Sequence, residues 1–153
     1  MRDHDDVVRR LIASVLLALI FSLSTAATAT EQLPCKQGCD VRLGTYEGHN
    51  DQGDAVRIHV SVGIFSSGPY KEARHIISHF KTRFVVDCGG KKANHYVDIT
   101  RWGYINGVKG HLQHGETYYW VLWAPGEPVK GDVELKSREC RGKTFFTVHR
   151  TGD

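Results

Sequence analysis

The sequence lacks any dense cluster of positive charge. Its formal net charge is +3, and lysine and arginine are spread along the chain, with Lys91-Lys92 as the only adjacent pair after residue 29. Proteins that bind phosphate backbones usually gather these residues on one surface, with aromatic rings between them. We therefore expect a solvated surface of mixed charge and no nucleic-acid partner.

Motifs of nucleophilic catalysis, zinc binding and calcium binding are also missing. No GxSxG turn occurs, and no cysteine is placed beside a histidine as nucleophilic catalysis requires. Zinc sites usually need two closely spaced ligand pairs, but only Cys35 and Cys39 are close in sequence. Residues 50–54 are similar to a calcium loop but lack its bidentate glutamate, which favours a polar hairpin tip. We expect no cofactor.

The one long apolar run lies at the N-terminus. Arg9-Arg10 precedes the segment LIASVLLALIFSL, and small residues follow as far as Ala27-Thr28-Ala29. This order predicts a signal helix, cleaved as a signal peptide of residues 1–29. A permanent membrane anchor is the alternative, but it needs roughly 20 apolar residues. A twin-arginine signal is disfavoured by the three aspartates before the run.

Export is therefore the expected destination of residues 30–153. These residues are enough for one domain and too few for two. We expect a single secreted domain in the periplasm, at the cell surface or in the medium, with no permanent membrane anchor.

All four cysteines follow the predicted cleavage point. An even number of cysteines in an oxidising compartment implies disulfides, and four cysteines allow three pairings that the sequence cannot distinguish. We favour Cys35–Cys39, because Gly38 lets so small a loop bend, together with Cys88–Cys140, which would tie the middle of the domain to its last strand.

The remainder of the chain shows the period-two pattern of β-strands. No long amphipathic helix or internal repeat is visible, and glycine-containing turns recur at short intervals. In residues 56–62, apolar side chains alternate with polar ones, as in a half-buried strand. We predict an all-β domain of about eight short strands, folded as an antiparallel sandwich or small barrel. The predicted strands are 41–48, 56–62, 76–88, 96–100, 104–112, 117–123, 131–136 and 144–149.

Two details of this prediction concern connections. Residues 65–74 contain Ser66-Ser67-Gly68-Pro69 and indicate a loop, while 75–81 could instead form a helical turn. Asn106-Gly107 marks a bend or hairpin inside 104–112.

A pattern of glycines, alternating apolar residues and cysteines runs from residue 43 to 150. Its elements are Gly44-x-Tyr46-x-Gly48, Gly53, Val56-x-Ile58-x-Val60, Cys88, Gly131-Asp132-Val133, Cys140-x-Gly142 and a last strand ending at Arg150. The pattern resembles a loosely defined, largely uncharacterised group of secreted bacterial β-sandwich domains. The resemblance implies the fold and a Cys88–Cys140 bond but no activity. The long 65–79 segment and the Cys35/Cys39 pair depart from it.

Histidines offer two candidate sites. His75 and His79 have a spacing that a metal site can use on a helical turn or on a strand. His114 and Glu116 are a possible base and acid of a small hydrolase or nuclease. Exposed loop residues explain the first pair better, and a strand-end turn explains the second.

Aromatic residues give the strongest candidate. In 117–123, alternation sends Tyr118, Trp120 and Leu122 to one face of the strand and Tyr119, Val121 and Trp123 to the other. One set can fill the core, and an uncovered set could stack on sugars, peptides or a partner sheet. The candidate binding residues are Tyr119, Trp123, Trp102 and Tyr104.

We therefore expect a non-catalytic exported module. It would bind a surface component of the cell envelope, a small ligand or a protein partner, through its aromatic face or the 65–79 segment. The alternatives are a secreted hydrolase or nuclease using His114 and Glu116, and a metal-binding protein using His75 and His79.

Overall fold

The computed structural model describes residues 35–67, 69–100, 103–124 and 127–152, so the predicted signal peptide lies outside the described residues. The described chain is all-β, as predicted. Within it, no helix long and apolar enough to cross a membrane is found. The strands are β1 (Cys35–Gln37), β2 (Gly44–Asn50), β3 (Ala55–Ser67), β4 (Tyr70–Cys88), β5 (Lys91–Ile99), β6 (Gly103–Asn106), β7 (Lys109–His114), β8 (Thr117–Leu122), β9 (Val129–Lys136) and β10 (Cys140–Gly152).

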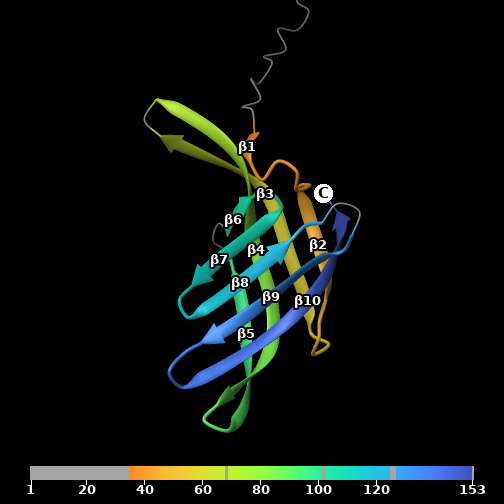
Figure 1. Ribbon diagram of the computed structural model, residues 1–153, viewed down its shortest axis with the longest axis vertical. Helices are drawn as coiled ribbons and strands as arrows, with labels where there is room; N and C mark the ends of the chain where they lie inside the picture. The colour runs from red at the N-terminus through yellow and green to blue at the C-terminus, as the bar shows by residue number, and fades with distance from the viewer. Residues whose placement is uncertain (1–34, 68, 101–102, 125–126, 153) are drawn as a thin grey trace, which may run out of the picture. The chain divides into compact units, whose positions relative to one another are not determined.

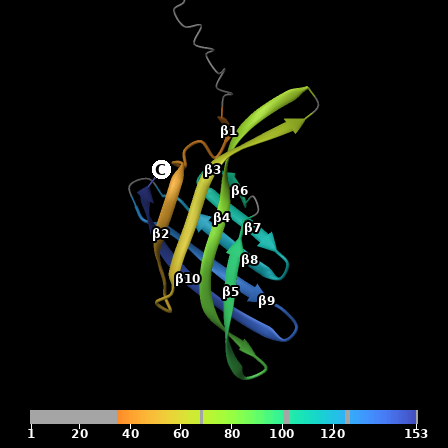
Figure 2. The same ribbon diagram turned by 180° about the vertical axis from the view of Figure 1, so that it is seen from behind.

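Eight of these strands form a closed barrel (Figures 1 and 2). The order around the ring is β4-β3-β2-β10-β9-β8-β7-β6, and the ring closes where β6 pairs with β4. Every pairing in the ring is antiparallel. Of the two predicted alternatives the structure is therefore the barrel. Within the ring, closure gives each strand a partner on both sides.

Two strands lie beside the ring rather than in it. β5 pairs only with β4, over Phe80–Cys88. β1 is parallel to β4 near Ala73, and the Cys35–Cys39 disulfide links its first residue to the turn that follows it.

The sequence located most strands but not all their boundaries. Asn106-Gly107 does separate two strands, β6 and β7, and Gly107 has the positive φ (57°) that a tight turn requires. Residues 65–74 do not form a loop, because β3 and β4 continue through them as a regular hairpin. The turn lies between Ser67 and Tyr70. Residues 75–81 are strand and not a helical turn.

The barrel interior is filled by large apolar side chains. At its centre the Tyr119 ring stacks on Phe80, with centroids 4.3 Å apart, and the Phe146 ring packs against Phe80 with centroids 5.6 Å apart. A further set of residues with almost no exposed surface surrounds these rings: Val41, Val56, Ile58, Val60, Ile77, Phe84, Ile105, Val133 and Val148. The interior is thus a packed core.

The turn between β2 and β3 is built around the side chain of Asn50. Asn50 is buried there, and its side-chain oxygen accepts hydrogen bonds from the backbone N–H groups of Gln52 (3.0 Å) and Asp54 (2.9 Å). Its amide nitrogen donates to the carbonyl oxygen of Arg83 on β4 (2.8 Å). The Arg83 guanidinium in turn bonds Asp54. Residues 50–54 are therefore a polar hairpin tip, as preferred from the sequence, and the tip is bonded to β4.

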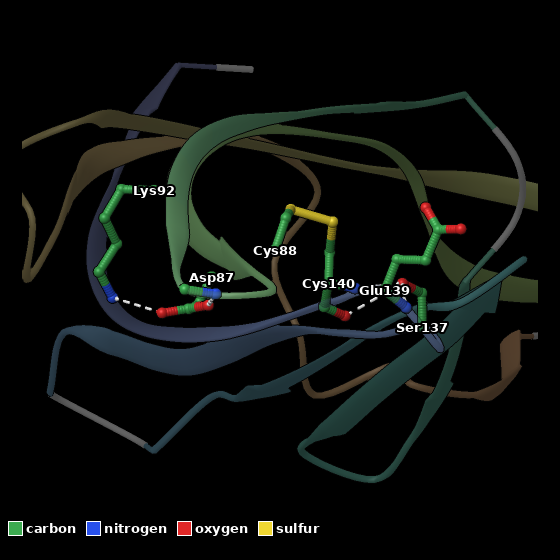
Figure 3. Close-up of a disulfide and its surroundings, with 7 residues drawn as sticks. Asp87, Cys88, Lys92, Ser137, Glu139 and Cys140 are labelled. Carbon is green, nitrogen blue, oxygen red and sulfur yellow. Dashed lines mark hydrogen bonds and ion pairs between the residues drawn. A yellow bond between two sulfur atoms is a disulfide. The ribbon is translucent and has the colours of Figure 1, made fainter.

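A disulfide joins the barrel just beyond this turn. Cys88 and Cys140 lie directly opposite each other on β4 and β10, with Cα atoms 4.0 Å apart (Figure 3). Each cysteine borders a tight turn held by a side chain. Asp87 accepts the N–H of Gly90 (2.7 Å), and Ser137 accepts the N–H of Cys140 (2.8 Å). Both favoured disulfide pairings are confirmed.

We expect replacement of Asn50 to destabilise the fold. Asn50→Ala removes the acceptor of two turn N–H groups and the amide donor to the Arg83 carbonyl, and each such loss costs about 1–3 kcal/mol when the group stays buried. Urea unfolding should show a drop of about 2 kcal/mol or more in the free energy of unfolding.

Asn94→Ala is the matched control, because Asn94 is exposed on β5. Its effect should stay within about 0.5 kcal/mol. Equal losses in the two variants would contradict the role assigned to Asn50.

Candidate functional site

On strand β8 and directly after it, the side chains that we expected to bind a ligand lie inside the barrel, and the other set faces outward. Tyr119 is fully buried and Trp123 nearly so, which places both in the core. Neither is available for stacking on an external ligand, and this corrects their assignment as binding residues. The outward set of the same strand is Tyr118, Trp120 and Leu122. Trp102 lies outside the described residues.

Tyr104 faces outward, as a binding residue should, and it begins a row of side chains across the sheet. It lies opposite His111 on β7, and His111 lies opposite Trp120 on β8. The row continues from Trp120 to Asp132 on β9 and from there to Phe145 on β10. We call these five residues the aromatic row.

The rings of the aromatic row are open to solvent. Tyr104, Trp120 and Phe145 have exposed fractions of 51%, 53% and 57%. The His111 and Trp120 rings stack on each other, with centroids 5.0 Å apart and planes 24° apart. Strands of a sheet lie about 4.8 Å apart, so the row spans about 19 Å from β6 to β10.

A shallow cleft of about 340 Å³ lies along the Phe145 half of the row. Trp120 and Leu122 line it from β8 and Phe145 from β10, while β9 contributes its backbone at Gly131. Lys109 and Lys130 stand at the rim, one on each side of Leu122 in the cross-strand register.

Polar groups lie within the row and beside it. Lys143 forms an ion pair with Asp132 (3.1 Å), and its ammonium lies 5.0 Å from the centroid of the Phe145 ring. On the same side of the row, Gln113 donates a hydrogen bond to the Tyr118 hydroxyl (2.9 Å). The surface thus offers apolar ring faces together with carboxylate, ammonium, amide and hydroxyl groups.

The two metal-site histidines do not come together. A β-bulge at Ser78 inserts one extra residue in β4, so that His79 pairs with His59 while Ile77 pairs with Val60. The extra residue reverses the alternation, and His75 consequently points inward, where its Nδ1 lies 2.8 Å from the Val41 carbonyl oxygen.

His79 points outward instead and bonds Asp98 on β5 (2.8 Å). This hydrogen bond, with a second one from Lys81, lowers the pKa of the Asp98 carboxyl. Among the described residues, no group of three or more histidine, cysteine, aspartate or glutamate side chains has the geometry to hold a metal ion. The pairing of His75 with His79 in one site is therefore wrong.

His114 and Glu116 lie at the hairpin turn between β7 and β8. His114 ends β7, Gly115 takes a positive φ (60°), and both His114 and Glu116 are exposed. The strand-end turn interpretation is confirmed. Neither residue lines the cleft on the aromatic row or the larger hollows at residues 47–57 and at the barrel end near Trp123.

No family model matches this chain, and no curated protein and no solved structure was found to be similar to it. The resemblance to secreted bacterial β-sandwich domains therefore stays a prediction.

The burial of Tyr119 has a measurable consequence at alkaline pH. Burial raises the pKa of its hydroxyl far above the ordinary value of 10.0. The unfolded chain releases this proton near pH 10 and the folded chain does not, so the free energy of unfolding should fall as the pH rises above about 10.

Tyr119→Phe removes the titrating group and keeps the ring, so its stability should decline less between pH 9 and 11. Urea unfolding at several pH values measures this difference. Tyr118→Phe is the control, because Tyr118 is only partly buried on the outer face. Identical pH profiles for wild type and Tyr119→Phe would contradict the interior position.

Proposed function

We propose that this protein is a non-catalytic extracytoplasmic module that binds a polysaccharide of the cell surface along the aromatic row. The observation that carries the proposal is the alignment of Tyr104, His111, Trp120 and Phe145 in one cross-strand register, with exposed rings. Contiguous exposed aromatic surface of this kind usually marks a binding site.

The chemistry of the row suits sugars. A sugar ring has an apolar face that packs on an aromatic ring, and hydroxyl groups at its edge that need hydrogen-bond partners. Trp120 and Phe145 supply ring faces on either side of Asp132, and Lys109 and Lys130 supply donors at the rim of the cleft. The length of about 19 Å fits an extended chain of several sugars better than a compact ligand.

The distribution of charge supports a sugar over a protein partner. The centre of a protein–protein interface is usually depleted of charged residues. Here Asp132 lies within the row, between Trp120 and Phe145, and pairs with Lys143, so the most apolar part of the surface carries charge. A ligand covered with hydroxyl groups tolerates this arrangement, because both charged groups can keep polar partners.

The expected compartment agrees with this role. Two disulfides are consistent with a location outside the cytoplasm. Together with the signal peptide predicted over residues 1–29, they support an encounter with envelope or extracellular polysaccharides.

We expect Trp120→Ala to weaken polysaccharide binding at least tenfold, because loss of a stacking contact worth about 1.4 kcal/mol changes the dissociation constant by that factor. Affinity electrophoresis in gels containing neutral or acidic polysaccharides identifies the ligand, and titration calorimetry then gives the dissociation constants. Phe145→Ala should also weaken binding.

Tyr96→Ala is the control, because Tyr96 is 69% exposed on β5, outside the row. It should bind as the wild type does. Unchanged binding in Trp120→Ala would remove the row as the site, and failure of every polysaccharide to retard the folded protein would remove the ligand class.

A further inference from the structure

The hairpin formed by β3 and β4 extends beyond the barrel as an arm (Figure 1). We define the arm as residues 62–67 of β3 and 70–75 of β4, which pair with each other in regular register. β2 pairs with β3 only as far as Val60. Beyond that point the outer edge of β3 has no strand partner within the described part of the chain.

Within the described residues, this open edge has none of the usual protections against pairing with another strand. Natural edge strands carry lysine, proline, a bulge or inward charges that block such pairing. Residues 61–67 read SVGIFSS, with no charged residue and no proline, and their pairing with β4 is without a bulge. The other edge of the arm is partly covered, because β1 pairs with β4 at Ala73 and Arg74.

Apolar side chains are also uncovered along this edge. Val62 and Ile64 have exposed fractions of 48% and 58% and lie on the same face of β3. Their neighbours Val60 and Ile58 on that face are fully buried inside the barrel. The apolar stripe of β3 thus continues past the point where the barrel stops covering it.

We propose that the open edge of β3 pairs antiparallel with the same edge of a second copy, which makes the protein a symmetric dimer. In a pairing centred on Gly63, Val62 lies opposite the partner subunit's Ile64, and Ile64 lies opposite the partner subunit's Val62. The two exposed apolar side chains of each copy then cover those of the other copy, and the centre holds no side chains that collide.

The charge of the segment favours a second copy over a different partner. Like charges that face each other oppose self-pairing of a strand, and this edge has no charges at all. It offers no charged group by which a different partner would be selected. A two-fold dimer is self-complementary by definition, so one segment satisfies both sides of the interface.

The test is the molar mass of the exported protein, measured by size-exclusion chromatography with light scattering at several concentrations. We expect the wild type to be a dimer and Ile64→Lys to be a monomer, because the substitution places two ammonium groups near the two-fold axis. Val85→Lys is the matched control, since Val85 is an exposed β-branched residue on the barrel part of β4. It should remain dimeric.

Hydrogen exchange gives a second measurement that does not need a variant. Amides in 61–67 should become more protected as the wild-type concentration rises, while those of β8 should not change. A wild type that stays monomeric with concentration-independent exchange would overturn the proposal, as would an Ile64→Lys protein that remains dimeric. Trp120→Ala should stay dimeric, so failure of the dimer and failure of polysaccharide binding are distinguishable.

Discussion

The structure depends on the pairing of one long strand, β4. Over its 19 residues it pairs with β3 along one side and, on reaching the end of the barrel, with the first residues of β10. Its other side pairs with β1, β6 and β5 in turn. The pairing with β6 closes the ring. The Cys88–Cys140 bond holds β4 to β10 beyond the turn between β2 and β3. Without β4 the sheet would have two open edges and an uncovered core.

Closure also decides where binding can occur. Phe80, Tyr119 and Phe146 fill the interior, so the barrel leaves no central cavity for a ligand at their level. The site that we propose lies on the outer surface instead. The register between neighbouring strands aligns residues that are far apart in the chain, as it does for Tyr104 and Phe145. The aromatic row is a product of strand pairing, and it carries its own hydrogen-bonding groups because charged residues share the outward positions of β9 and β10.

Much of the fold follows from local sequence. Alternation in residues 56–62 and the Asn106-Gly107 turn predicted strands and a hairpin. The sequence left three cysteine pairings open, and the structure has the one that we favoured. The arm was missed because Ser66-Ser67-Gly68-Pro69 has the composition of a loop, although only its middle makes the turn. The bulge at Ser78 has no signal in the sequence, and it separates His75 from His79.

The sequence by itself determined that β8 has two aromatic faces, one with Tyr119 and one with Trp120. Only the tertiary structure decided that Tyr119 lies inside and Trp120 outside. The physical reason is that period-two alternation divides a strand into two sets of side chains but does not state which set the closing sheet will enclose. Both sets on β8 are rich in large rings, so hydrophobicity could not make that choice. Closure of the barrel set the register of β7 and β9 against β8 and so decided which set lies inside. The same register placed Trp120 in line with His111 and Asp132.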